Sequence, residues 1–97
     1  MNGLKGKIAI VTGGTQGLGA TIARLFARRG AGGLVICGRN RAKGQTVAES
    51  IKTQTGVEMV FVEADLGTVD DCRNVVGVCD RVFGKVDILI NAAAVTD

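Results

Sequence analysis

Residues 12–19, which read Thr-Gly-Gly-Thr-Gln-Gly-Leu-Gly, constrain the fold of this 97-residue chain more than any other segment. They follow the apolar run at residues 8–11 and precede a stretch with helical periodicity. A strand, a glycine-rich turn and a helix in this order form the first unit of dinucleotide-binding folds. Glycine lets a phosphate approach the backbone, and the first turn of the helix offers free N–H groups to it. The segment therefore predicts a site for the pyrophosphate of a dinucleotide.

The three glycines of this segment have different expected roles. Gly13 is placed for the tight turn, Gly17 for close approach of the ligand, and Gly19 for packing the helix on the strand. The alternative is a tight strand-to-helix turn without a ligand, since glycine makes up 15 of the 97 residues. The segment lacks the Gly-Lys-Ser/Thr ending of a Walker A loop, which argues against a nucleotide triphosphatase.

Strands and helices alternate along the chain. Expected strands span residues 7–12, 34–37, 57–64 and 86–91, and expected helices start at residues 17 and 41 and after a cap at Thr68. Glycines at positions 30, 56 and 84 mark the helix ends. The alternation predicts an α/β fold, a Rossmann-type parallel sheet with strand order 3-2-1-4 and helices on both faces.

The fourth expected strand would be an edge strand, although residues 86–90 are as apolar as a buried strand. We therefore expect the sheet to be incomplete, with residues 1–97 forming the N-terminal part of a dinucleotide-binding (Rossmann) domain. Within it, we expect the first helix to pack through Leu18, Ile22, Leu25 and Phe26. The third helix should have an apolar stripe of Cys72, Val75, Val76, Cys79, Val82 and Phe83. Gly44 weakens the prediction of the second helix.

Composition argues against several classes of function. The net charge is only +3, and the basic residues are scattered without aromatic residues between them, so we expect no nucleic-acid surface. The three cysteines have no Cys-x-x-Cys spacing and no histidine accompanies them, so we expect buried thiols rather than a metal site. No apolar segment is long enough for a secretory signal or a membrane span, which predicts a cytoplasmic protein without a membrane partner.

Arg39 follows the second expected strand, about twenty residues beyond the glycine segment. An NAD site usually places an acidic residue here, to bind the ribose 2′-hydroxyl. This chain has Gly38 and Arg39 instead, and a guanidinium can bind a 2′-phosphate with two hydrogen bonds. The alternative is an ordinary surface arginine after a strand. The pattern favours NADP over NAD.

The motif Thr12-Gly13-x-x-x-Gly17-x-Gly19 resembles the cofactor loop of the short-chain dehydrogenase/reductase family, and the resemblance continues to Asn91-Ala92-Ala93-Ala94. It implies a set of cofactor-binding residues, namely Gly13, Thr15, Gln16, Gly17, Leu18, Gly19, Arg39, Asp65, Leu66, Asn91, Ala92 and Ala93.

The resemblance also implies individual roles. Asp65 would accept a hydrogen bond from the adenine amino group, and Leu66 would line the adenine pocket. Asn91 and the alanines after it would support the sheet and touch the ribose on the nicotinamide side. Asp65 has a structural alternative, in which it begins the turn toward the Thr68 cap, and both roles can hold together.

The chain departs from the family pattern at three places, one of which is Ala94, where the family has glycine. Gln16 stands where NADP-binding members carry a basic residue, and Ala92 replaces a second asparagine, which puts in doubt a hydrogen bond to the neighbouring strand.

The family resemblance implies an NADP-dependent oxidoreductase that moves a hydride between the nicotinamide and a carbonyl or alcohol substrate, and that forms a homo-oligomer when complete. The family's catalytic serine and Tyr-x-x-x-Lys pair have no counterpart here, since the sequence contains no tyrosine. We therefore name no catalytic residue and expect residues 1–97 to be inactive alone. Two alternatives are a non-catalytic dinucleotide-binding module and an interaction protein that pairs its fourth strand with another chain.

Overall fold

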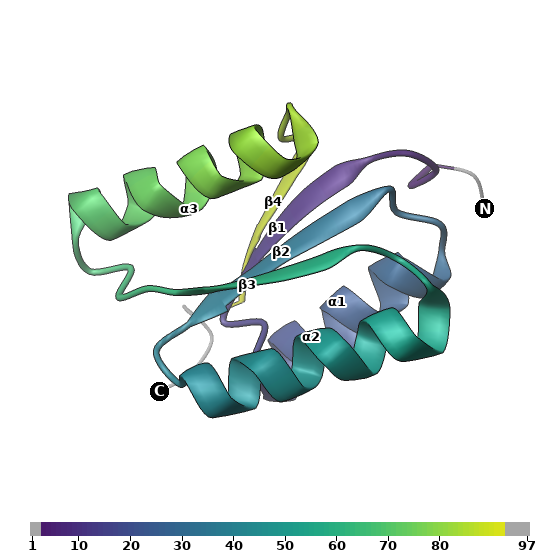
Figure 1. The fold of residues 1–97 in the computed structure, drawn as a ribbon, viewed down its shortest axis with the longest axis horizontal. Coiled ribbons are helices and arrows are strands. Elements are labelled where there is room, and N and C mark those ends of the chain that lie inside the picture. Colours follow the sequence, from purple (N-terminus) through teal and green to yellow (C-terminus); the bar gives the residue numbers. More distant parts are fainter. Residues whose placement is uncertain (1–2, 93–97) are drawn as a thin grey trace.

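The computed structural model describes residues 3–92, in which strands and helices alternate as Figure 1 shows. The strands are β1 (Ile8–Thr12), β2 (Gly33–Gly38), β3 (Met59–Glu63) and β4 (Ile88–Asn91). The helices are α1 (Gly17–Arg28), α2 (Arg41–Thr55) and α3 (Val69–Phe83). The predicted elements are present in the predicted order, while β3 and β4 are shorter than expected.

The strands form one parallel sheet in the order β3-β2-β1-β4. Val11 of β1 lies beside Ile36 of β2 on one side and Ile90 of β4 on the other. The carboxyl ends of the strands therefore meet at one edge of the sheet, where α/β folds bind their ligands. The predicted Rossmann-type order 3-2-1-4 is confirmed.

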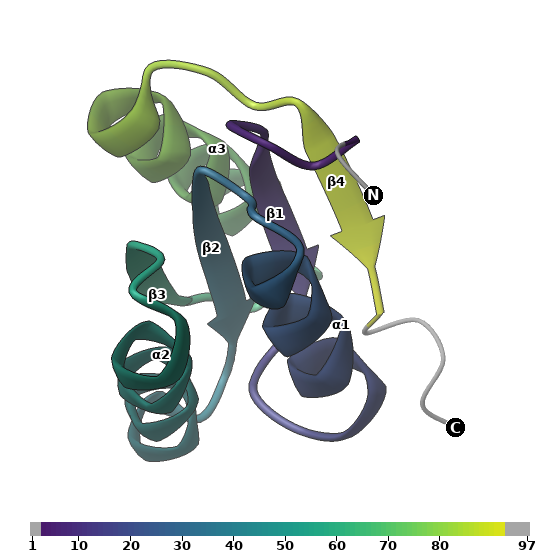
Figure 2. The same ribbon diagram turned by 90° about the vertical axis from the view of Figure 1, so that its right-hand side faces the viewer.

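Helices cover both faces of this sheet, as predicted. Figures 1 and 2 show α1 and α2 on one face and α3 on the other. The core on the first face contains Ala9, Val11, Ala23, Ala27, Leu34, Ile36, Ala48 and Ile51. The core on the second face contains Ile8, Ile10, Val35, Cys37, Val62, Val75 and Cys79. Because β1 and β2 are buried on both faces, their sequences are continuous apolar runs.

Helix α1 contacts the sheet through small side chains. Ala20, Ala23 and Ala27 are buried, whereas Leu18 and Leu25 are 54% and 45% exposed. The expected packing through Leu18 and Leu25 is therefore wrong. Alanines allow the helix axis to lie close to β1 and β2. Ile22 and Phe26, the other two residues of the expected set, are partly buried against the same core, as expected. Helical periodicity thus identified the element and two of the four residues that pack on the core.

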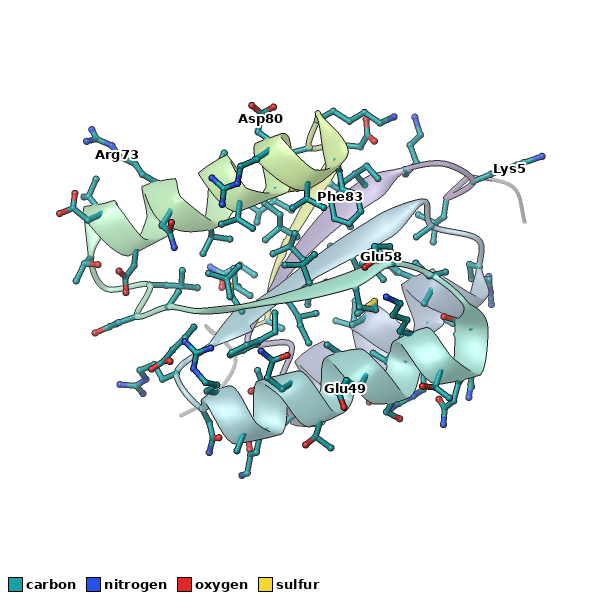
Figure 3. The ribbon with its side chains drawn as sticks, in the orientation of Figure 1. Lys5, Glu49, Glu58, Arg73, Asp80 and Phe83 are labelled. Carbon is teal, nitrogen blue, oxygen red and sulfur yellow. The ribbon has the colours of Figure 1, made fainter. Side chains whose placement is uncertain are left out.

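Helix α3 buries a narrower stripe than expected. Val75 and Cys79 are buried, but Val76 and Val82 are about half exposed, at 51% and 48%. Cys72 is also exposed, which corrects the expectation that it is buried. Figure 3 shows Phe83 on the side of α3 that faces the sheet, while Arg73 and Asp80 point away from it. The side chains of Val76 and Cys72 border an apolar groove toward the edge strand β4 instead of entering the core.

The other two cysteines, Cys37 and Cys79, are buried, as expected. Burial raises the pKa of the Cys37 thiol to about 11, because the thiolate would lose its hydration inside the sheet. Cys37 is therefore a neutral core residue near neutral pH.

Residues next in the sequence to the ends of α2 and α3 cap these helices. Thr68 caps α3 as predicted, because its Oγ1 accepts a hydrogen bond from the Asp71 N–H at 3.2 Å. Gly56 and Gly84 end α2 and α3 with positive φ values of 78° and 80°. No helix in the described part of the chain is long and apolar enough to cross a membrane.

Asp87 fixes the start of the edge strand. Its Oδ2 accepts a hydrogen bond from the Ile8 N–H at 2.8 Å, and its own N–H donates to the Ile8 carbonyl. The hydrogen bond from Ile8, followed by that from Lys85, lowers the pKa of the Asp87 carboxyl. Further along β4, half-buried and exposed residues alternate, as in an edge strand, and Leu89 is 63% exposed.

The glycine within α2 has a packing role that the sequence does not reveal. A Cβ atom at Gly44 would collide with the ring of Phe61 on β3. Gly77, in the middle of α3, is exposed and has no atom within 4 Å of its Cβ direction. The two glycines provide a matched pair, because both occupy helical positions but only one faces a neighbour.

Alanine substitution should have opposite effects at these positions. Gly77→Ala should raise the free energy of unfolding by about 0.5–1 kcal/mol, because alanine loses less backbone entropy in a helix. Gly44→Ala should lower it by roughly 1–3 kcal/mol, because the ring of Phe61 must move. Urea denaturation of the two variants measures both changes. A stabilised Gly44→Ala variant would contradict the packing described here.

Candidate functional site

The glycine turn joins β1 to α1 at the carboxyl edge of the sheet. Gly13 and Gly17 have positive φ values of 71° and 58°, which favour glycine. The Gly13 N–H donates to the Cys37 carbonyl at 2.9 Å and so ties the turn to β2. A Cβ at Gly19 would collide with the Gly13 carbonyl oxygen. Gly19 was expected to let the helix pack on strand β1. Its close contact is instead with Gly13 of the turn, one residue beyond the end of that strand.

Helix α1 begins without a side-chain cap. Its N-cap residue, Gln16, makes no capping hydrogen bond, and the first turn contains no acidic residue. The helices α2 and α3, in contrast, are capped by Asn40 and Thr68. The first N–H groups of α1 and the positive end of its dipole are thus available to an anion.

A cleft of about 580 Å³ lies at this helix start. It is lined by Gly13, Thr15, Gln16, Gly17, Leu18, Gly19, Gly38, Arg39, Leu66 and Ala92. The structure therefore brings the glycine turn together with residues that follow β2, β3 and β4. Among the expected residues that the structure describes, two do not line this cleft. Asp65 and Asn91 border neighbouring hollows, and Ala93 lies outside the described residues.

Arg39 reaches the cleft because β2 ends close to the glycine turn. A Cβ at Gly38 would be only 3.0 Å from Cγ2 of Thr15, so a side chain at this position would require the Thr15 side chain to shift. Arg39 follows directly and is exposed. Arg39 thus lines the cleft at the end of the strand beside β1.

Asp65 has the structural role considered as an alternative. Its Oδ1 accepts a hydrogen bond from the Gly67 N–H at 2.9 Å, and its carbonyl accepts one from the Thr68 N–H at 3.1 Å. These bonds form the turn that leads to the cap of α3. Asp65 also borders a hollow that Arg39 shares, so it lies next to the cleft without lining it.

Asn91 holds the edge strand to β1. Thr12 Oγ1 donates to Asn91 Oδ1 at 2.8 Å, and the Ala92 N–H donates to the Thr12 carbonyl at 3.1 Å. The Asn91 side chain borders the apolar groove beside α3, whereas Ala92 lines the cleft at the glycine turn. The two residues therefore belong to different surfaces.

Two polar residues near the cleft were missed in the sequence. Asn40 caps α2 by accepting a hydrogen bond from the Lys43 N–H at 3.0 Å. Lys43 also donates from Nζ to Gln16 Oε1 at 2.9 Å. The Asn40 cap could have been found from its position before a helix. The Lys43 contact joins residues that are far apart in the sequence, so local patterns carry no signal for it.

Comparison with known proteins identifies the family. The family model described as short chain dehydrogenase matches residues 7–97. The chain belongs to the short-chain dehydrogenase family. Over 92 residues it is 39% identical to an oxidoreductase of Thermotoga maritima, covering 95% of this chain and 35% of that protein. Over 86 residues it is 44% identical to the (-)-isopiperitenol/(-)-carveol dehydrogenase of Mentha piperita, covering 89% of this chain and 31% of the relative.

Solved structures of short-chain dehydrogenase relatives have the same fold. L-Sorbose reductase from Gluconobacter frateurii, complexed with NADPH and L-sorbose, matches with a TM-score of 0.87 and 36% identity over 92% of this chain and 34% of its own. Alcohol dehydrogenase from Thermococcus sibiricus, complexed with 5-hydroxy-NADP, matches with a TM-score of 0.81 and 28% identity over 86% of this chain and 35% of its own. The chain thus spans about a third of the length of the relatives it matches.

Proposed function

We propose that residues 1–97 form a dinucleotide-binding unit that holds NADP(H) in the cleft at the glycine turn. The observation that carries this proposal is the start of α1, where uncapped N–H groups and Gly17 face the cleft. A Cβ atom added to Gly17 would have no other atom within 4 Å. A pyrophosphate can therefore approach the backbone there and accept hydrogen bonds from the first turn of the helix.

The residues at the ends of β2 and β3 suit the adenosine half of the ligand. Leu66 is half-buried and offers an apolar surface to the adenine ring. Asp65 is exposed beside it, and a carboxylate oxygen there can accept a hydrogen bond from the adenine amino group. Both stand at the carboxyl edge of the sheet, as the ligand requires.

Arg39 supports NADP over NAD as the ligand. An acidic side chain at the end of β2 would repel a 2′-phosphate, whereas the guanidinium of Arg39 can donate two hydrogen bonds to it. Two related structures, both more than 25% identical in sequence, are complexes with NADPH or 5-hydroxy-NADP. On the nicotinamide side, the small side chain of Ala92 leaves room for a ribose at the end of β4.

We further propose that this unit serves an oxidoreductase acting on a carbonyl or alcohol substrate. The bound nicotinamide would supply the hydride chemistry, and the residues of this chain would bind and orient it. None of the 97 residues is a tyrosine, the general acid or base implied by the family resemblance, so residues 1–97 alone should show no turnover. The proposal includes a cytoplasmic location, which the sequence predicts, and a homo-oligomer, which the family resemblance implies.

The glycine turn is tested by Gly17→Val in the full-length protein. The valine side chain would occupy the space proposed for the pyrophosphate, so the Kd for NADP should rise at least about tenfold. Gly56→Val is the matched control, because Gly56 also has a positive φ of 78° and no atom within 4 Å of its Cβ direction. It lies at the far end of α2 and should leave the Kd unchanged. Isothermal titration showing equal affinity in folded Gly17→Val and wild type would refute the assignment.

The choice of cofactor is tested by Arg39→Ala. Loss of a charge-assisted contact should weaken NADP binding by about 1.5–3 kcal/mol and leave NAD binding nearly unchanged. Arg73→Ala removes the same charge from the outer side of α3, as Figure 3 shows, and should alter neither affinity. Titration of both cofactors decides the matter, and an equal loss for NADP and NAD would contradict the role of Arg39.

A further inference from the structure

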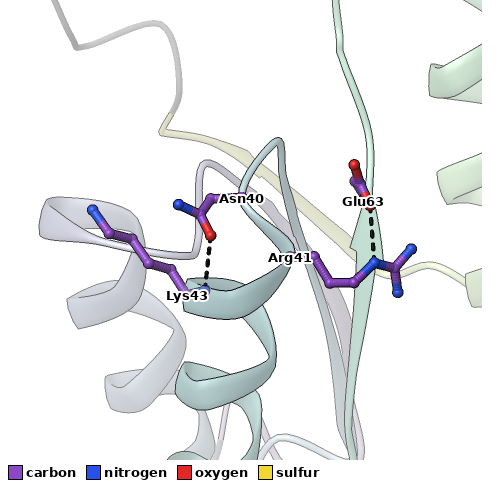
Figure 4. A network of polar contacts seen from close by, with 4 residues as sticks. All are labelled: Asn40, Arg41, Lys43 and Glu63. Carbon is purple, nitrogen blue, oxygen red and sulfur yellow. Dashed lines mark hydrogen bonds and ion pairs between the residues drawn. The ribbon is translucent and has the colours of Figure 1, made fainter.

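A second cation stands beside the cleft, outside the sequence motif. Lys43 belongs to the first turn of α2, and Figure 4 shows its side chain pointing away from Arg41. Its Nζ donates a hydrogen bond to Oε1 of Gln16, which lines the cleft, at 2.9 Å. We propose that Lys43 is a specificity-determining residue that binds the 2′-phosphate of NADP together with Arg39. This inference rests on the proposed function and names a second residue of that site.

The basic residues at the start of α2 differ in their partners. The Arg41 Nε forms an ion pair with Glu63 Oε1 at 3.0 Å, and Figure 4 shows this pair on the opposite side from the Lys43 side chain. Arg41, which borders a hollow together with Arg39, is therefore already paired with a carboxylate. Lys43 instead contacts the amide of Gln16, which carries no charge. The positive charge of Lys43 is thus free to act on an anion at the cleft.

The charge of Lys43 does not serve the helix itself. A cation in the first turn meets the positive end of the helix dipole, and the first turn of α2 has no acidic residue to compensate it. The cap of α2 is supplied by Asn40, which uses only the backbone N–H of Lys43. An anion held between Gln16 and Arg39 would compensate this charge.

The positions of the two cations suit a phosphate bound between them. Arg39 lines the cleft from the end of β2. Lys43 instead lines the neighbouring hollow beside Thr15 and contacts the cleft through its hydrogen bond to Gln16. The glycine turn itself carries no basic residue, so Lys43 brings a positive charge to the turn from another element. A phosphate dianion would gain two hydrogen-bonded charges, the planar fork of arginine and the point charge of lysine. NAD has a hydroxyl at this place and would gain little from Lys43.

Lys43→Gln is the informative variant, because it removes the charge and keeps an amide that can donate to Gln16. In the full-length protein we expect it to raise the Kd for NADP about tenfold and to change the Kd for NAD less than about twofold. Lys43→Arg should retain the preference for NADP. Lys52→Gln removes the same charge near the other end of α2, where Lys52 pairs with Glu58, and should have no effect on either affinity.

Salt provides a second readout that a purely structural contact would not move. Raising the salt concentration should reduce the ratio of NADP to NAD affinity more in the wild type than in Lys43→Gln. Salt screens the attraction between Lys43 and the phosphate, and the variant lacks this attraction. Equal weakening of both cofactors in Lys43→Gln, or an unchanged NADP affinity, would overturn the inference while leaving the proposed function standing. A wild-type protein that binds neither cofactor would overturn both.

Discussion

The contact between the glycine turn and the start of α1 determines the rest of the site. Gly19 lies so close to the Gly13 carbonyl that no side chain fits, and the Gly13 N–H is hydrogen-bonded to the end of β2. These contacts fix the direction in which α1 leaves the sheet. The first N–H groups of α1 are uncapped at the cleft because the side chain of Gln16 makes no capping hydrogen bond. A side chain at Gly19 would separate the turn from the helix and move those N–H groups.

Small residues allow close approach between segments elsewhere in the fold as well. Alanines bring α1 close to β1 and β2, and Gly38 lets the end of β2 approach Thr15. Close packing here places the end of each strand within reach of a single ligand. The arrangement depends on missing side chains as much as on those present, because a packed interior has little spare volume.

The sequence was sufficient for the parts of the structure that depend on local signals. The apolar runs and the alternation of strands and helices predicted the sheet order, and the Thr68 cap was predicted because capping is a contact between near neighbours. The exposure of Leu18 and Leu25 was not predictable, since periodicity does not reveal how close a helix lies to its sheet. The role of Gly44 depends on Phe61 across the interface, and the Lys43 contact with Gln16 depends on the folded path of the chain. The motif thus predicted which residues of the glycine turn line the candidate cleft. It did not predict the contacts between segments that are distant in the sequence.

The charges around the cleft connect the fold with the choice of ligand. Uncapped N–H groups of α1 suit the pyrophosphate, and the side chains of Arg39 and Lys43 suit a phosphate on the adenosine ribose. A crystal structure of the full-length protein with NADP tests this account most directly. We expect pyrophosphate oxygens to accept hydrogen bonds from the first turn of α1, with the 2′-phosphate between Arg39 and Lys43. A pyrophosphate bound away from Gly17, or a 2′-phosphate that contacts neither cation, would contradict it.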